Sequence, residues 1–209
     1  MPITSVPSSH QISYMGVQAL KSSHPQVRKL KRQQQGHYAH GNKVWRSSFV
    51  LMDYLSDQAI PQHSRVLDIG CGWGLTAIYL AKQFNANVTG IDIDASVEPF
   101  LTLQAEINDC QISFQRRSFE SLTKSELAKY HSLIGTDICF WDELTVPLFN
   151  VIRRAISAGC QNIYIADPGR PPFWSLADQC VAKLGADVIS RSIEHPWKTE
   201  KYILRLGGE

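Results

Sequence analysis

Two short stretches of the chain carry residues whose types and spacing suit the binding of a nucleoside. In VLDIGCGWG, residues 66–74, three alternating glycines follow an apolar run and the acid Asp68. Glycines lack a Cβ atom, so the backbone can turn tightly there and approach a ligand closely. In VTGIDID, residues 88–94, Asp92 ends a second apolar run. A carboxylate at that position can accept hydrogen bonds from a ribose diol.

The spacing of the glycines distinguishes two classes of ligand. A dinucleotide-binding loop has the pattern GxGxxG, which seats a pyrophosphate on a helix N-terminus. Here the glycines are Gly70, Gly72 and Gly74, and Leu75 stands where that pattern requires the third glycine. Asp68 disfavours an anion and favours a cation, so the loop suits a phosphate-free ligand with a positive end. A tight turn without any cofactor is the alternative interpretation.

The elements that must position these residues alternate in type along the chain. A helix is expected at 44–57, and from residue 64 apolar runs of strand length alternate with segments of helical periodicity. Strict alternation implies right-handed crossovers and a mostly parallel sheet with helices on both faces. We therefore predict an α/β, Rossmann-like, doubly wound fold with seven strands. The last two strands, at 187–194 and 199–207, are joined by a short turn and should form an antiparallel pair.

Composition and patterning divide the chain into an N-terminal arm at 1–43 and one domain at 44–209. The arm is rich in Ser, Gln and His and contains the basic run RKLKR at 28–32. That run is either a solvated helical turn or a contact surface for an acidic partner or a lid. The 209 residues, 44% apolar, are enough for one core. A net charge of +2 indicates neither nucleic acid nor a membrane surface as partner.

The five cysteines are scattered and form no CxxC pair, which favours reduced thiols in a cytoplasm. We predict no metal site. Neither a signal-peptide pattern nor a run of 18 apolar residues is present, so no membrane span is expected. The sequence does not indicate an oligomeric state.

Together, VLDIGCGWG and VTGIDID resemble the first two motifs of the class I, seven-strand methyltransferases, which use S-adenosylmethionine and release S-adenosylhomocysteine. The resemblance extends from about residue 44 to the C-terminus. It implies that the glycine loop and Asp68 wrap the methionine half and that Asp92 holds the ribose. Many members have an acid after the third strand that contacts adenine, whereas this chain has Ser118 there. We therefore expect Phe119 and Glu120 to hold the adenine. The predicted cofactor-binding residues are Trp45, Asp68, Gly70, Cys71, Gly72, Trp73, Gly74, Asp92, Ile93, Phe119 and Glu120.

Two further stretches resemble the lysine methyltransferase-like branch of these enzymes. HGNKVWRSSFVLMDYL is similar to its entry helix, and Asp137 to Phe140 is similar to its DxxY/F motif. This resemblance implies a protein lysine as methyl acceptor, with Asp137 and Phe140 as catalytic residues. Aromatic faces attract cations, so Trp141 and Trp197 are expected to contact the substrate, although Trp141 in the core is an equal alternative.

A carboxylate beside a lysine ammonium favours the charged form of the amine and opposes its deprotonation. We therefore expect Asp137 to orient the amine while water takes its proton. Asp167 is either catalytic or a turn former, and Arg170 pairs either with it or with a substrate carboxylate. Two other functions stay open: a small-molecule N-methyltransferase for a nicotinamide-like amine, and a cofactor-binding regulator without catalysis. NPPY and DPPY stretches are absent, which argues against a nucleic-acid substrate.

Overall fold

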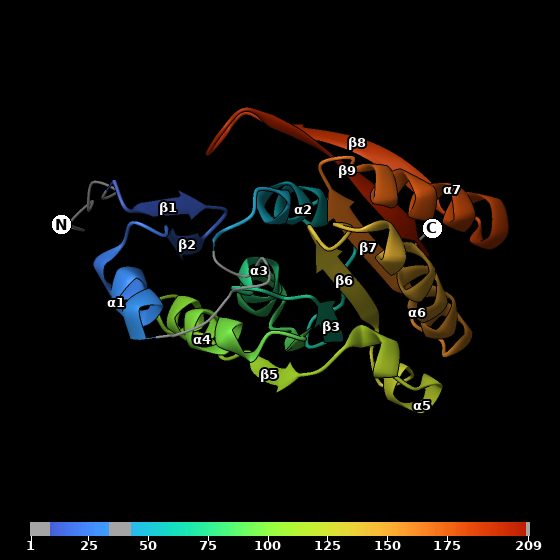
Figure 1. The fold of residues 1–209 in the computed structure, drawn as a ribbon, viewed down its shortest axis with the longest axis horizontal. Helices are drawn as coiled ribbons and strands as arrows, with labels where there is room; N and C mark the ends of the chain where they lie inside the picture. Colours follow the sequence, from blue (N-terminus) through green and yellow to red (C-terminus); the bar gives the residue numbers. More distant parts are fainter. Residues whose placement is uncertain (1–8, 34–42, 208–209) are drawn as a thin grey trace.

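The computed structural model of the protein describes residues 9–33 and 43–207 (Figure 1). Seven strands form its main sheet: β3 (Arg65–Ile69), β4 (Asn87–Asp92), β5 (Ser113–Arg116), β6 (Ser132–Thr136), β7 (Asn162–Asp167), β8 (Asp187–Ile193) and β9 (Thr199–Leu206). Their spatial order is β5-β4-β3-β6-β7-β9-β8. The first five in this order pair in parallel, and β9 runs antiparallel to both β7 and β8. The predicted fold class is therefore confirmed.

Helices cover both faces of this sheet because side chains alternate along each buried strand. In β3, Val66 packs with helices α2 (Ser47–Leu55) and α3 (Leu75–Phe84), whereas Leu67 packs on the opposite face with α6 (Thr145–Ser157) and α7 (Pro171–Leu184). The other helical segments are η1 (Ala95–Val97), α4 (Glu98–Glu106), η2 (Phe119–Ser121), α5 (Lys124–Leu127) and η3 (Asp142–Leu144). Figure 1 shows α5, α6 and α7 grouped away from α3 and α4.

The described part of the predicted arm is folded against the domain. A hairpin of β1 (Gln11–Tyr14) and β2 (Val17–Leu20) is followed by helix α1 (Pro25–Gln33), which contains the basic run. Met15 and Gly16 both have positive φ in the hairpin turn, as a two-residue hairpin favours. Figure 1 places these elements beside α4. The arm's residues 1–8 and 34–42 lie outside the described part of the chain, as do 208–209 of the predicted domain.

Amide side chains on α4 and just beyond it hold the free edge of β2. The Gln104 side chain accepts a hydrogen bond from the Leu20 N–H and donates one to the Leu20 carbonyl, each at 2.9 Å. Asn108 does the same for Gln18, at 2.8 and 2.7 Å. Both amides are buried. Because a buried backbone group without a partner is costly, these four bonds fix the hairpin against the domain.

Within residues 9–33 and 43–207, no helix combines the length and the apolar character needed to span a bilayer. In the same residues, no three His, Cys, Asp or Glu side chains gather closely enough to hold a metal ion. All five cysteines are free thiols.

Candidate active site

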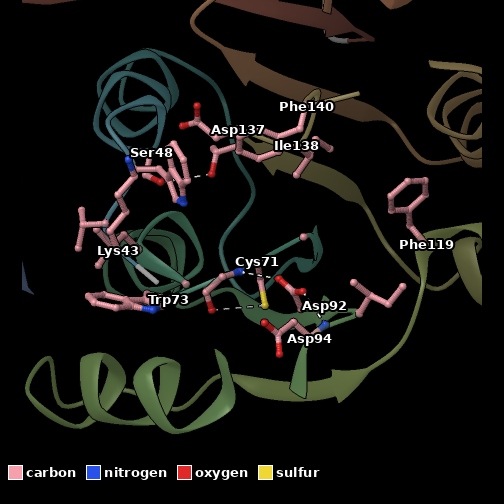
Figure 2. A pocket seen from close by; sticks show the side chains of 18 of the residues that line it. Lys43, Ser48, Cys71, Trp73, Asp92, Asp94, Phe119, Asp137, Ile138 and Phe140 are labelled. Carbon is pink, nitrogen blue, oxygen red and sulfur yellow. Dashed lines mark hydrogen bonds between the residues drawn. The ribbon is translucent and has the colours of Figure 1, made fainter. Parts of the chain in front are cut away.

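A cavity opens at the carboxyl ends of β3, β4 and β6, facing the chain that enters α2 (Figure 2). Parallel sheets place their ligand crevice at this edge. The space inside the cavity and its open mouth is about 820 Å³. Most predicted site residues line it, namely Trp45, Gly70, Cys71, Gly72, Trp73, Gly74, Asp92, Ile93, Phe119, Asp137, Phe140 and Trp141.

The three loop glycines all have positive φ, but their surroundings differ. A Cβ atom added at Gly70 would lie 2.6 Å from Ile138 Cγ2, and one at Gly74 would lie 3.1 Å from the Leu101 side chain. Packing within the protein therefore requires those two glycines. A Cβ atom at Gly72 would meet no atom within 4 Å. Gly72 thus leaves open space at the cavity wall, into which a ligand can approach the backbone.

Asp92 ties the glycine loop to the end of β4. Its Oδ2 accepts a hydrogen bond from the Gly72 N–H at 3.1 Å, and its Oδ1 accepts one from the Asp94 N–H at 3.0 Å. Burial raises the pKa of the Asp92 carboxyl, and these two backbone donors oppose the rise. A carboxylate has about four acceptor sites, so Asp92 keeps capacity for the hydroxyl donors of a diol.

Asp68 lies behind the cavity wall instead of lining it. It is 2% exposed, and its Oδ1 has no hydrogen-bond partner. Burial, and next the nearby Asp92, raise the pKa of Asp68 well above its usual range. A buried carboxylate without a partner is unfavourable, and a positive charge in the cavity would offset that cost. A phosphate-free, positively charged ligand therefore fits this end of the cavity.

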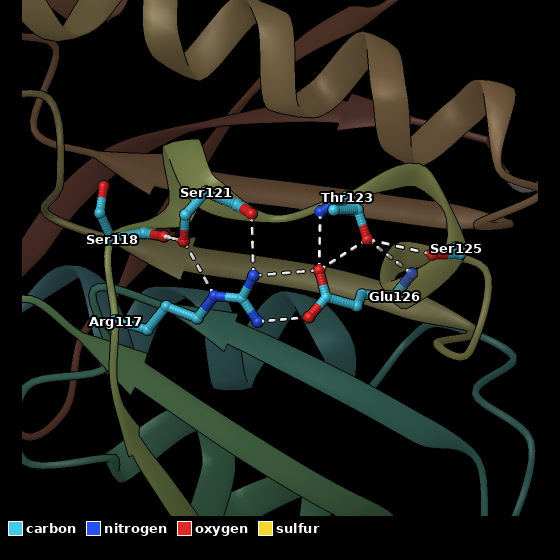
Figure 3. Close-up of polar contacts among 6 residues, drawn as sticks. All are labelled: Arg117, Ser118, Ser121, Thr123, Ser125 and Glu126. Carbon is cyan, nitrogen blue, oxygen red and sulfur yellow. Dashed lines mark hydrogen bonds and ion pairs between the residues drawn. The ribbon is translucent and has the colours of Figure 1, made fainter.

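Phe119 reaches the cavity from a segment that polar contacts hold rigid (Figure 3). The Arg117 guanidinium makes two bonds to Glu126, at 2.6 and 3.0 Å, and donates another to the Ser121 carbonyl at 2.8 Å. Glu126 also accepts from the Thr123 N–H and hydroxyl, which closes a capping box at α5. These bonds fix η2, on which Phe119 lies.

Aromatic rings wall the other end of the cavity. The Trp45 and Phe140 rings meet edge to face at 5.3 Å between centroids, and Trp141 lies 5.6 Å from Phe140. The Lys43 Nζ stands 4.1 Å from the centroid of Trp45. Trp141 is 49% exposed, so it stands at the mouth and not in the core.

Asp137 sits between this aromatic wall and the core, with φ of +54°. Its N–H donates to the Ala166 carbonyl at 2.9 Å, which explains why the backbone turns there. Its Oδ2 accepts from the Ser47 N–H at 3.3 Å, and its Oδ1 pairs with Arg170 at 3.1 Å. Arg170 also pairs with Asp167 at 2.6 Å, one of the two partners considered from the sequence.

Three predicted site residues do not line the cavity: Asp68, Glu120 and Trp197. Glu120 is exposed on η2, where its carbonyl accepts a bond from Arg154 at 3.0 Å. Trp197 packs edge to face on Phe49 of α2 and lies under the Arg46 guanidinium. The cavity also has lining residues that the sequence analysis missed: Lys43, Val44, Ser48, Leu75, Asp94, Thr136, Ile138 and Leu144.

Some of the missed residues carried a sequence signal. Asp94 belongs to the IDID stretch, and Thr136 and Ile138 flank Asp137. Ser48 carried none, because it reaches the cavity only through the packing of α2 on the sheet, where its hydroxyl bonds with that of Thr136 at 3.2 Å.

A seven-stranded sheet with an antiparallel edge pair, and a glycine loop after its first strand, are the features of the class I methyltransferase fold. Residues 66–159 match the family described as a methyltransferase domain. The chain is 31% identical over 133 residues to an electron transfer flavoprotein beta subunit lysine methyltransferase of Xenopus laevis, covering 63% of this chain and 53% of that protein. It therefore spans about half the length of this relative.

Other relatives carry different acceptors in their names. A ubiquinone biosynthesis O-methyltransferase of Coxiella burnetii is 37% identical over 75 residues, covering 36% of this chain and 32% of that protein. Among solved structures, the fold is similar to a tRNA (uracil-54, C5)-methyltransferase of Pyrococcus abyssi in complex with S-adenosyl-L-homocysteine. The TM-score is 0.57 at 16% identity, covering 93% of this chain and 42% of that one. Residues 66–159 thus match a methyltransferase domain, and the chain as a whole shares the fold of methyltransferases of known structure.

Proposed function

We propose that this protein transfers a methyl group to the amine of a protein lysine side chain, with the cofactor bound in the cavity described above. The observation that carries the proposal is the aromatic wall, where Trp45 already accommodates the ammonium of Lys43 at 4.1 Å. A lysine side chain from a substrate has the same chemistry as Lys43. The lysine methyltransferase relative supports a protein acceptor.

The cofactor half of the cavity is assigned to residues around the glycine loop. Asp92 is proposed to bind the ribose hydroxyls and Phe119 to pack on the adenine, while Gly72 lets the ligand approach the backbone. The buried carboxylates Asp68 and Asp92 are proposed to balance the positive charges of the cofactor's methionine half. S-adenosylmethionine supplies an electrophilic methyl group on a sulfonium, and the protein has to hold the acceptor in line with it.

The acceptor half is assigned to Trp45, Phe140, Trp141 and Asp137. The rings exclude water and attract the ammonium by about 0.5–2 kcal/mol. Asp137 orients the amine, and water receives its proton before transfer. Loss of that proton costs about 4.6 kcal/mol at pH 7 for a side chain with the reference pKa of about 10.4.

The shape of the mouth favours a protein side chain over a free small molecule. Trp141 is half exposed and Trp197 is packed on α2, so these two rings do not roof the cavity. A small molecule is the second candidate acceptor, and the relative named as a ubiquinone biosynthesis O-methyltransferase supports it. Free cysteine thiols are consistent with a reducing cytoplasm.

The test is to incubate the purified protein with radiolabelled S-adenosylmethionine and a cell lysate. A labelled protein band that releases methyl-lysine on hydrolysis is expected. Label in the small-molecule fraction alone would favour the second candidate, and binding of cofactor without any labelled product would favour a regulator.

Two variants assign the halves of the cavity. Asp137→Ala is expected to lower turnover more than cofactor affinity, and Asp92→Ala to lower cofactor affinity more. Equal losses of both quantities in each variant would contradict the assignment. Asp57→Ala, whose carboxylate pairs with Arg191 away from the cavity, serves as the control.

A further inference from the structure

Arg170 stands directly behind the acceptor half of the cavity, although it does not line it. Its guanidinium lies 3.1 Å from Asp137 Oδ1, and the same group is 4.3 Å from the ring centroid of Phe140 and 5.8 Å from that of Trp45. All three partners line the cavity. Only these side chains therefore separate Arg170 from the position assigned to the acceptor amine.

Asp167, at the end of β7, anchors Arg170 in this place. Asp167 Oδ2 accepts from the guanidinium at 2.6 Å, and Asp167 Oδ1 accepts from the backbone N–H groups of Gly169 and Arg170, each at 2.9 Å. Asp167 has no exposed side-chain surface, whereas Arg170 keeps 22%. The buried Asp167 carboxylate thus fixes the backbone at Gly169 and Arg170 with two bonds and holds the guanidinium with a third, which is shorter than the contact with Asp137.

Few other charges face this cluster. Burial raises the pKa of Cys139, which lies beside the two aspartates, well above its usual range. Burial also raises the pKa of Cys180 on α7 to about 12, so both thiols stay neutral. Asp142 and Glu143 on η3 are exposed to solvent, and the Lys43 ammonium lies over Trp45. In the described part of the chain, Asp137 is therefore the carboxylate that lines this end of the cavity, with Asp167 and the partly buried Arg170 guanidinium behind it.

We propose that Arg170 is a positioning residue that weakens the preference of the acceptor site for an ammonium and so lowers the pKa of the bound amine. Asp137 without a partner would stabilise the ammonium and retain its proton, which opposes methyl transfer. The guanidinium offsets part of the negative charge of Asp137, yet leaves the carboxylate an acceptor site with which to orient the N–H groups of the amine. The inference rests on the proposed amine acceptor. It explains how Asp137 can orient the amine while opposing its deprotonation less than an unpaired carboxylate would.

The size of the effect follows from the distances. A hydrogen bond of about 2.9 Å to Asp137 places an amine about 6 Å from a guanidinium that is 3.1 Å beyond the carboxylate. At an effective dielectric constant of about 20, one unit charge at that distance shifts an amine titration by about one to two pH units. Removing the guanidinium should therefore raise the pKa of the bound amine by about that amount.

The experiment measures this pKa directly, without turnover. The protein is saturated with S-adenosylhomocysteine, and ¹³C-labelled n-butylamine, a mimic of the lysine side chain, is titrated with pH while its bound resonance is followed by NMR. We expect the midpoint in Arg170→Gln to lie about one to two units above that of the wild-type protein. Arg170→Lys keeps the charge but not the planar fork that bridges the two aspartates, so its midpoint should lie between those of the wild type and Arg170→Gln.

Arg191→Gln is the matched control, because Arg191 bridges Asp53 and Asp57 at 2.6 and 2.8 Å outside the cavity. Its bound amine should titrate as in the wild type. An equal midpoint in wild type and Arg170→Gln, or an equal rise in Arg191→Gln, overturns the role of Arg170 and leaves the amine acceptor standing. Failure of the wild-type complex to bind the amine overturns both the role of Arg170 and the amine acceptor. Binding of S-adenosylhomocysteine is measured separately and tests the cofactor site alone.

Discussion

Substitution of Gly72 by alanine separates a glycine needed for a ligand from one needed for the fold. Gly72 has φ of +50° and no atom within 4 Å of an added Cβ. Gly185, at the end of α7 and outside the cavity, has φ of +69° and an equally empty surrounding. Gly185→Ala is therefore a control with the same backbone strain and no cavity.

The structure sets the expected magnitudes. A left-handed conformation costs a non-glycine residue about 1–2 kcal/mol, which lowers Tm by about 2–8 °C in a chain of this size. Both variants should show this loss. In Gly72→Ala, the methyl group also occupies space that the cofactor uses. Overpacking of this kind costs about 1–3 kcal/mol, which corresponds to an affinity about 5- to 150-fold weaker.

The assay is calorimetric titration of each variant with S-adenosylhomocysteine, beside thermal unfolding without ligand. Gly72→Ala should lose both stability and affinity, and Gly185→Ala only stability. If Gly72→Ala binds the ligand as tightly as Gly185→Ala does, the open space at Gly72 is not part of the ligand site.

Two further predictions concern charge and packing. Burial raises the pKa of Asp68 and Asp92, so both carboxyls take up protons as pH falls; affinity for the cationic cofactor should then fall, while the ligand-free fold gains stability. Calorimetry in buffers of different ionisation enthalpy should show that protons are released when the cofactor binds. Proton uptake on binding would contradict this prediction. Gln104→Leu leaves the Leu20 N–H and carbonyl without their side-chain partner, which should cost about 2–4 kcal/mol in urea unfolding. Gln83→Leu, which loses one exposed contact, should cost far less, and equal losses would refute the bracing role of Gln104.

The sheet and its helices could be predicted because each strand carries its own local signal. Runs such as the apolar residues of β3 and β7 are buried on both faces and are bounded by turn residues. The N-terminal hairpin was missed because its strands have four residues each and its stabilising partners are the amides of Gln104 and Asn108. Those partners are more than 80 residues away along the chain, so no local window contains the signal.

The same distinction holds within the site. The glycine loop and Asp92 form a local pattern that the structure places around one cavity. The surroundings of Asp137 could not be read from its DxxF stretch, because Arg170 and Ser47 arrive from other elements. Trp197 was expected near the substrate from its place in the final turn, but the β8–β9 hairpin carries it onto Phe49 of α2.

The distribution of charge relates the two halves of the cavity. At the cofactor half, the buried Asp68 and the partly buried Asp92 have no guanidinium or ammonium paired to them in the described residues, and a cationic ligand would offset the cost of their charge. At the acceptor half, Asp137 and Asp167 share Arg170, so the protein itself supplies the positive charge. In the proposed reaction, the first half would bind the charged cofactor, and Arg170 in the second half would lower the cost of removing the proton of the amine.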